Sequence, residues 1–476
     1  MYNRYYLYAY LAFCLPIALH IIFRIKPKHK IINLIITYWF LISPVIRSRL
    51  FRDTNPFRFI TGRAWRFGWQ IAWLFLLLLI MRFLTVKNSK FLSQKKMPVY
   101  EKFLYAYLFI SIFVTYFHLF VGNIPEIYSF ARQFMYYQAL LFYFVIVKFI
   151  DKDTIKCIFR SSIYMAVFSS FTCTVQFFYN TWFMRSDRVP RAFEGYHRST
   201  GIFPTPQEHV FITAVGIFLI IFMVRNKFIK SGLLILFFQG ILLTFSRGSW
   251  MAVLMPVMLY LFYMERKLFF KLTGFGILFG LIFFMFFEAY TPDLSKITES
   301  DVMEERVMSD TASQRFDFYY YTLQTIWDAW VFGYGDKENN EVYYKWMFIA
   351  GGKDWALGHG GGIHNLLLEE LFFKGLFSTL SLILFFFSFF LYCHKKALKE
   401  NNYLYLIPLY FNITFLLYMM TAAAFLSSYG GFMVILFTAI VSAVYHNDID
   451  ITEFTIYRQE KKLHPVKHKD LAYSKS

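Results

Sequence analysis

The sequence has little charge for its length. Asp, Glu, Lys and Arg make up 17% of its 476 residues, whereas hydrophobic residues make up 58%. Soluble domains carry about 25% charged residues, so a water-soluble chain of this composition could not bury its apolar side chains. Disordered, collagen-like and disulfide-scaffold proteins are excluded as well. The composition therefore predicts a membrane protein that crosses the bilayer many times.

Cysteine is also scarce. The four cysteines, Cys14, Cys157, Cys173 and Cys393, lie far apart and form no C-x-x-C pair. The spacing predicts neither a zinc site nor a disulfide framework, and buried, unreactive thiols are expected. The first apolar run ends in Arg24-Ile-Lys26 without a small-residue cleavage site. It is therefore expected to be the first span and not a signal peptide.

The sequence lacks nucleotide-binding loops. Neither G-x-x-x-x-G-K-[ST] nor a Rossmann fingerprint occurs. Chemistry must then use energy stored in a membrane-borne substrate or in an ion gradient. This leaves transport, or group transfer from an activated lipid. No cofactor and no nucleic-acid partner are expected.

Apolar runs account for most of the chain and predict an all-α, polytopic bundle of about 12–13 transmembrane helices. We expect about ten spans in residues 1–288, a large extracytoplasmic loop with short amphipathic helices over 289–365, further spans over 366–446 and a basic tail over 447–476. The runs lie near 5–23, 31–46, 67–85, 103–121, 132–149, 157–179, 209–224, 231–246, 250–264, 268–288, 366–393, 402–424 and 429–445.

Lysine clusters fix the expected orientation. Counting spans puts all of them on one side, which the positive-inside rule assigns to the cytoplasm. The clusters lie at 24–30, 87–102, 148–156, 225–230, 265–271, 395–399 and 458–475. The N-terminus is then outside and the C-terminus inside. The segments 47–66 and 180–208, expected on the outer face, contain arginine but no lysine. The alternative is that 31–46 is re-entrant and 47–66 is cytoplasmic.

The first motif whose residues could take part in binding or catalysis is Thr244–Trp250, between two apolar runs. Arg247 lies at the hydrocarbon boundary, where a charge is costly and commonly functional. A guanidinium fork binds phosphate or carboxylate through two bonds. Gly248 is expected to let the backbone turn. The alternative is an arginine that merely extends to the interface.

The external segment 289–365 contains the second motif, Ser313–Phe318. Ser313 is a plausible cap, and Arg315 would lie in the first turn of the helix that follows, where a bound anion would stabilise its positive charge. The helix is expected to lie along the membrane or to pack on the spans, and to end at Gly333-Tyr334-Gly335. Its aromatic and apolar residues repeat at helical spacing: Phe316, Tyr319, Tyr320, Leu323, Trp327 and Trp330.

The third motif is the glycine-rich stretch Gly358–Asn365. His364 and Asn365 stand where the next apolar helix begins, and the positive end of that helix would keep the imidazole neutral and able to accept a proton. The alternative is that His364 only caps the helix. His359, surrounded by glycine, is the weaker candidate.

The fourth motif is the turn Arg198–Gln207, which contains two prolines and a glycine. Together with Arg191 it adds positive charge to an external pocket. The four motifs describe a site with several arginines and one histidine, without an obvious metal cluster or nucleophile. Such a site suits a diphosphate-bearing lipid, because diphosphate leaves readily once its charge is neutralised.

The ordered set resembles the O-antigen ligase and O-antigen polymerase (Wzy-like) family. The resemblance rests on Arg198–Phe203, Ser246-Arg247-Gly248, Arg315 with Gly333-x-Gly335, and His364-Asn365, and spans about residues 198–380. Two features depart from the family pattern. The turn after Phe203 reads Pro-Thr-Pro-Gln in place of an asparagine-containing turn, and Lys374 precedes Gly375 where glutamate is common.

The resemblance implies a metal-independent, inverting glycosyltransferase at the outer face of the cytoplasmic membrane. Its donor would be an undecaprenyl-diphosphate-linked glycan and its acceptor another lipid-linked glycan (polymerase) or a different molecule (ligase). The product would be a surface polysaccharide, with a flippase and a chain-length regulator as further partners. Arg247 and Arg315 would bind the diphosphate, His364 would act as base, and Arg198, Arg191, Asn365 and His359 would line the pocket.

A transporter for lipid-linked sugars is the alternative function. Intramembrane charges favour it, but most lie near predicted span ends, and no repeated halves are visible. The residues concerned are Arg82, His118, Arg132 and Glu288. An external acyl or phosphoglycerol transferase would need a carboxylate–metal or Ser/His constellation that the sequence does not supply.

Overall fold

The computed structural model describes about half of the chain. The described residues are 95–121, 139–140, 142–148, 150–183, 191–193, 196–203, 205–274, 319–320, 322–335, 363, 365–420 and 429–454. The predicted spans at 5–23, 31–46 and 67–85, the segment 47–66 and most of the basic tail lie outside these residues. So do Arg315, His359 and His364.

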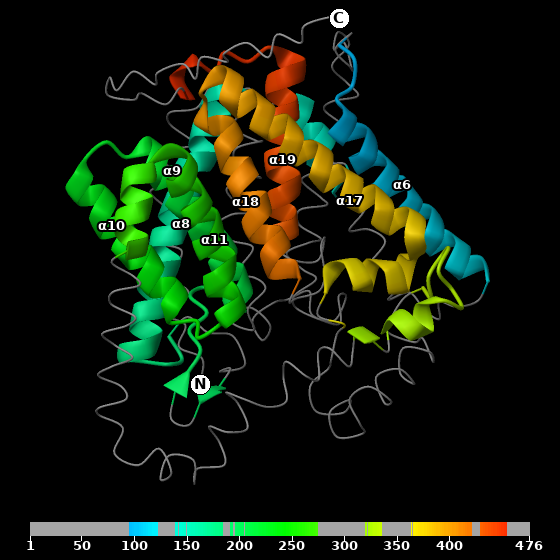
Figure 1. Ribbon diagram of the computed structural model, residues 1–476, viewed down its shortest axis with the longest axis horizontal. Helices are drawn as coiled ribbons and strands as arrows, with labels where there is room; N and C mark the ends of the chain where they lie inside the picture. The colour runs from blue at the N-terminus through cyan, green and yellow to red at the C-terminus, as the bar shows by residue number, and fades with distance from the viewer. Residues whose placement is uncertain are drawn as a thin grey trace, which may run out of the picture.

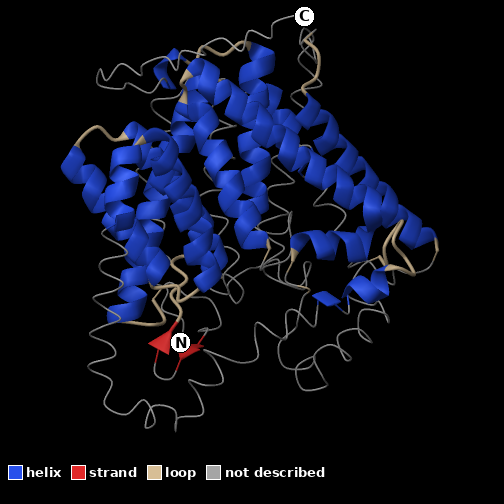
Figure 2. Ribbon diagram, in the orientation of Figure 1, coloured by secondary structure: helices blue, strands red, loops and turns tan. Residues whose placement is uncertain are grey.

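The described part is helical apart from one two-stranded hairpin (Figure 2). The helices are α6 Val99–Phe120, α8 Lys152–Phe178, α9 Pro206–Met223, α10 Lys227–Leu242, α11 Arg247–Met264, α17 Leu366–Glu400, α18 Tyr403–Met419 and α19 Tyr429–Asn447, with a 3-10 turn at Thr452–Phe454. The hairpin pairs β1 (Arg191–Phe193) with β2 (Tyr196–His197) antiparallel. Helical residues also occur at 139–140, 142–148, 266–274, 319–320 and 322–326.

Several of these helices are long and apolar enough to cross a bilayer. Within the described residues four qualify by length and hydropathy, namely α8, α9, α17 and α19, and α11 and α18 are shorter apolar helices. The prediction of an all-α, multi-pass membrane protein is confirmed. Side chains before the helices explain where several of them start: Asp151, Thr205, Asn226, Asn365 and Asn402 each accept a bond from a backbone N–H in the first turn.

Helices distant in sequence lie side by side (Figure 1). α17 packs along α6, and the pairs Tyr100–Phe389 and Ser111–Ser378 show that the two run antiparallel. α8, α9, α10 and α11 form a second group. α18 joins the two groups, because it contacts α17, α11 and α9.

One end of the bundle is basic, and we call it the basic end. It is held together by contacts of the segment 447–453 with other helices: Lys95 pairs with Asp448, Lys152 and Lys156 pair with Glu453, and Asn447 donates to the Val147 carbonyl at 2.7 Å. The helix ends next to the described lysine clusters lie at this end (Figure 1), and the prediction that it faces the cytoplasm stays a prediction. The other end carries the loops before α9, α11 and α17, and we call it the turn end.

The predicted span 366–393 is not one continuous helix. α17 is broken at Gly375, where φ is 77° and ψ is −176°. The N–H of Leu376 donates to the Trp330 carbonyl at 2.8 Å, so it makes no helical bond. Residues Leu366–Lys374 therefore form a separate short helix at the turn end, and the long helix starts after Gly375 (Figure 1).

Candidate functional site

The turn that carries Arg198 is fixed to the helices behind it. Ser199 donates its N–H to the Leu243 carbonyl at 2.9 Å and its hydroxyl to the Cys173 carbonyl at 3.2 Å. Gly201 has a φ of 62°, and a Cβ there would collide with the Ser169 side chain. Glycine is required because other residues rarely adopt this conformation and would lack the space.

Gln176 on α8 holds the same turn. Its side chain is 1% exposed, its amide oxygen accepts from the N–H groups of Thr200 at 2.9 Å and Gly201 at 3.1 Å, and its amide nitrogen donates to the Gly201 carbonyl at 2.7 Å. It also donates to the Phe183 carbonyl at 2.8 Å. The arginine is thus placed by a rigid backbone, and sequence reasoning missed the residue responsible.

Arg247 is the first residue of α11. The chain reverses just before it, at Phe245, which has a φ of 46°. The expectation that Gly248 makes the turn is wrong, because Gly248 already lies in the first helical turn. The structure describes the backbone of Arg247 and not its side chain.

The Arg198 turn, the start of α11 and the end of α18 meet at Tyr418. The side chains of Ser249, Ser246 and Gln207 face the Tyr418 hydroxyl, and Arg198 is close enough to act on it electrostatically. Tyr418 is 4% exposed and Ser249 is fully buried. Two of the predicted motifs therefore lie next to each other at the turn end.

The segment 319–335 of the predicted external loop reaches the same end. The Tyr319 hydroxyl donates to the Met420 carbonyl at 3.2 Å, two residues after Tyr418. The predicted helix is shorter than its aromatic repeat suggests. It ends at Ile326, after which turns continue to Phe332, and Trp327 is 77% exposed.

The turn Gly333-Tyr334-Gly335 docks on the backbone of α17. The N–H of Tyr334 donates to the Phe372 carbonyl at 2.8 Å, and that of Gly335 donates to the Phe373 carbonyl at 3.0 Å. Both glycines have positive φ, 68° and 82°, and a Cβ on Gly333 would lie 2.5 Å from the Lys374 nitrogen. This turn occupies the carbonyls that an unbroken α17 would use.

Asn365 caps the short helix. Its side-chain oxygen accepts from the N–H groups of Leu367 at 3.0 Å and Leu368 at 3.2 Å, and the residue is 6% exposed. The cap is therefore Asn365, although the sequence made His364 the capping alternative and Asn365 a pocket residue. His364 lies outside the described residues, between the buried Ile363 and this cap.

Of the remaining predicted residues, the structure describes some and not others. Arg191 begins β1, at the turn end (Figure 2), and its side chain lies outside the described part. His118, considered for a transporter, lies in the last turn of α6, where its Nε2 is 2.9 Å from the Phe332 carbonyl oxygen. It anchors the loop. Arg82, Arg132 and Glu288 lie outside the described residues.

The described ranges contain three of the four cysteines. Cys157, Cys173 and Cys393 are buried, as predicted, and form no disulfide with one another, and Cys14 lies outside those ranges. Among the described side chains, no group of three or more His, Cys, Asp or Glu residues could hold a metal ion.

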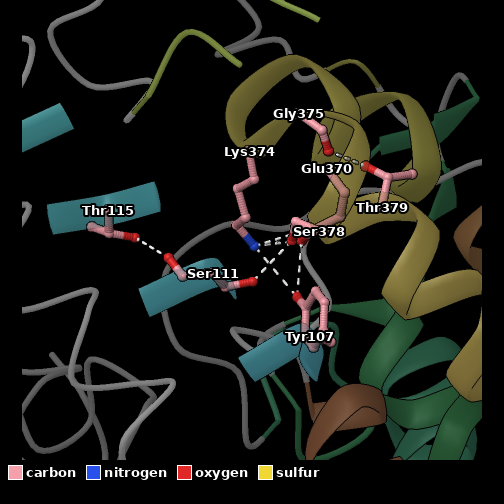
Figure 3. A network of polar contacts seen from close by, with 8 residues as sticks. All are labelled: Tyr107, Ser111, Thr115, Glu370, Lys374, Gly375, Ser378 and Thr379. Atoms are coloured by element: carbon pink, nitrogen blue, oxygen red, sulfur yellow. Dashed lines mark hydrogen bonds and ion pairs between the residues drawn. The ribbon is translucent and has the colours of Figure 1, made fainter. Parts of the chain in front are cut away.

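Sequence reasoning also missed a polar network between α6 and α17 (Figure 3). Glu370 and Lys374 form an ion pair that the Tyr107 hydroxyl joins. The signal was present, because a Glu and a Lys four residues apart inside an apolar run can pair on one helix face.

Residues 232–386 match the family described as O-antigen ligase. The matched stretch, and not the whole chain, is similar to that family. It begins in α10 and ends in the long part of α17, so it contains Arg247, Arg315, Gly333-x-Gly335 and His364. The family is one of membrane enzymes that transfer glycans from lipid-linked substrates. No match was found among characterised proteins.

Proposed function

We propose that this O-antigen ligase family protein is a metal-independent, inverting polysaccharide polymerase or ligase of the cytoplasmic membrane. The donor is an undecaprenyl-diphosphate-linked glycan, and the acceptor is a hydroxyl of a second glycan or lipid-linked molecule. The basic end faces the cytoplasm and the turn end faces outward. The loop over 289–365 is the catalytic loop between the spans of 1–288 and those of 366–446.

The single observation that carries the proposal is the convergence of the motif segments. Ser199, next to Arg198, bonds to Leu243, four residues before Arg247. Tyr418 contacts Ser246, and Tyr319, four residues after Arg315, bonds to Met420. Segments far apart in sequence thus meet at one end of the bundle, which is what a shared arginine pocket requires.

The chemistry follows from these residue types. Arg247 and Arg315 hold the diphosphate and neutralise its charge as the bond to the sugar breaks, with Arg198 and Arg191 adding positive charge around it. His364 accepts the proton of the acceptor hydroxyl, and His359 lines the same pocket. Asn365 serves by fixing the helix start beside His364. Displacement in one step inverts the anomeric carbon.

The experiment compares variants of the purified protein on lipid-linked glycan extracted from a strain that lacks it. Arg247→Ala, Arg315→Ala and His364→Ala should abolish new glycosidic linkages, and Arg247→Lys should also fail, because a point charge cannot replace the fork. Arg266→Ala, an exposed arginine just after α11, is the matched control and should stay active.

The outcomes separate the alternatives. Full activity in all three alanine variants would disprove the assignment. Movement of the lipid across vesicle membranes without new linkages would instead identify a flippase. Product that lengthens on the same lipid carrier indicates a polymerase, and transfer to a different acceptor indicates a ligase.

A further inference from the structure

A largely buried ion pair lies where the short helix Leu366–Lys374 meets α6 (Figure 3). Lys374 Nζ is 2.7 Å from Glu370 Oε1 and 2.6 Å from Oε2, and the side chains are 16% and 7% exposed. The Tyr107 hydroxyl donates to Glu370 Oε1 at 3.3 Å, and its ring centroid is 5.5 Å from the ammonium. Both charges therefore have their partners away from bulk water.

The contact with α6 continues across the break in α17. Ser111 and Ser378, one on each helix, are hydrogen-bonded at 2.9 Å, and the Thr379 hydroxyl donates to the Gly375 carbonyl at 3.0 Å. α6 thus contacts residues on both sides of Gly375. The bonds of Tyr107 and Ser111 hold α6 against both the short helix and the long helix.

The docked turn Gly333–Gly335 contacts the short helix as well. Its bonds go to the carbonyls of Phe372 and Phe373, which lie between Glu370 and Lys374 in sequence. The opposite end of the short helix begins at the Asn365 cap. A shift of this helix would therefore move the docked loop and the chain leading to His364 at the same time.

Stability alone does not account for such a pair. Removing two charges from water costs about as much as their attraction returns, and apolar replacements of similar volume are often neutral or stabilising. A hydrogen-bonded ion pair does, however, restrict geometry more than apolar contacts do. The pair lies beside the loop over 319–335 and the segment of His364, whose positions matter for the proposed reaction.

We propose that Glu370, Lys374 and Tyr107 are positioning residues that clamp the short helix, and through it the loop over 319–335 and the His364 segment, in the geometry for glycan transfer. This inference rests on the proposed function. None of the three needs to touch the substrate. Their effect should appear in the rate of transfer and in the docking of the loop, with donor binding little changed.

The first test replaces both charges in the full-length protein reconstituted in nanodiscs. Glu370→Met with Lys374→Met keeps side-chain volume and leaves no unpaired charge. Because small misplacements of reacting groups cost large factors in rate, kcat on the extracted lipid-linked glycan should fall at least about tenfold, with KM changed less than about threefold. The matched control is Lys396→Met with Glu400→Met, the other i,i+4 pair on α17, whose distance is 2.7 Å.

A charge exchange provides the rescue. Lys374→Glu alone sets two carboxylates together and should be inactive. Adding Glu370→Lys restores an ion pair, and the Tyr107 hydroxyl can serve either partner. Recovery of activity in the exchanged pair supports the clamp even if the methionine variant does not fold. An exchanged pair that folds but stays as inactive as Lys374→Glu, or a methionine variant with wild-type kcat, overturns it.

Hydrogen exchange gives a readout independent of catalysis. The N–H groups of Tyr334, Gly335 and Leu376 report docking directly, because each donates to a carbonyl across the contact. Their exchange should accelerate at least about fivefold in the methionine variant as local opening becomes easier, and not in the control. Unchanged protection overturns the clamp. If the wild-type protein forms no linkages, the proposed function fails, while this readout still decides whether the pair holds the loop.

Discussion

The side-chain amide of Gln176 bonds to both backbone groups of Gly201. Its oxygen accepts the Gly201 N–H at 3.1 Å and its nitrogen donates to the Gly201 carbonyl at 2.7 Å. With the bonds to Thr200 and Phe183, the amide uses all four of its hydrogen-bonding positions on backbone. A helix residue thereby determines where the Arg198 turn lies.

Gln176→Leu should destabilise the protein and lower glycan transfer. Several backbone groups of the turn would lose their partner, and leaving one buried group unsatisfied costs about 1–3 kcal/mol. The melting temperature in detergent and the transfer rate measure the two effects. Gln324→Leu, an exposed glutamine of the 319–326 helix, is the control. Equal melting temperatures for the two variants would contradict this role of Gln176.

Gly201→Ala should also destabilise the protein. The φ of 62° alone costs a non-glycine residue about 1–2 kcal/mol, and the added methyl group would lie 2.8 Å from the Ser169 carbonyl oxygen. Gly232→Ala is the matched control, because nothing lies within 4 Å of its Cβ position and it sits in α10. In thermal unfolding, Gly201→Ala should melt below wild type, and Gly232→Ala should melt at or above it. An unchanged melting temperature for Gly201→Ala would refute the strained turn.

Acid should loosen the segment 448–454. Thr452 N–H lowers the pKa of Asp450 below its usual value, and the hydrogen bonds from Lys152 and Lys156 lower the pKa of Glu453. A carboxyl with a lowered folded-state pKa stabilises the fold above its unfolded pKa of about 4 and loses that effect as the pH falls through the folded value. Pulsed hydrogen exchange, corrected for intrinsic rates, should show opening only below about pH 4.

The control for this prediction is Glu453→Gln. It removes the carboxylate that binds both lysines, so much of the opening should be present already at neutral pH. A segment that stays closed in the variant and in acid would show that apolar contacts, such as those of the buried Phe454, suffice to hold it.

Thiol labelling should report the orientation. In a Cys14→Ser background the described native cysteines are buried, so they contribute little signal. A membrane-impermeant maleimide should label Trp182→Cys, at the turn end, in intact cells, and should label Lys227→Cys, at the start of α10, only after lysis. The opposite pattern would place the arginine turn in the cytoplasm and end the proposed localisation.

The sequence predicted the described helices well because hydropathy and caps are local signals. The run at 209–224 corresponds to α9 at Pro206–Met223, and the difference at its start reflects the Thr205 cap and Pro206 in the first turn. The break at Gly375 could not be read in this way. It depends on a loop some forty residues earlier that takes the helix carbonyls, and a window of apolar residues contains no such information.

The candidate site was predicted in outline only. The Arg198 turn and the start of α11 lie next to each other, because Ser199 bonds to the Leu243 carbonyl, and a shared arginine pocket stays a prediction. Gln176 looks like an isolated polar residue in an apolar helix, and its four bonds exist only once the turn has folded against it. Likewise, the spacing of Glu370 and Lys374 suggests a pair but does not reveal that Tyr107 joins it.

The two ends of the bundle should respond differently to ionic strength. At the basic end, exposed side chains pair across the segment 447–453, and dissolved salt screens such pairs. The turn end is joined mainly by uncharged backbone and amide contacts, which salt leaves intact. Concentrated salt during purification would therefore weaken the contacts of the segment 447–453 first and leave the arginine turn in place.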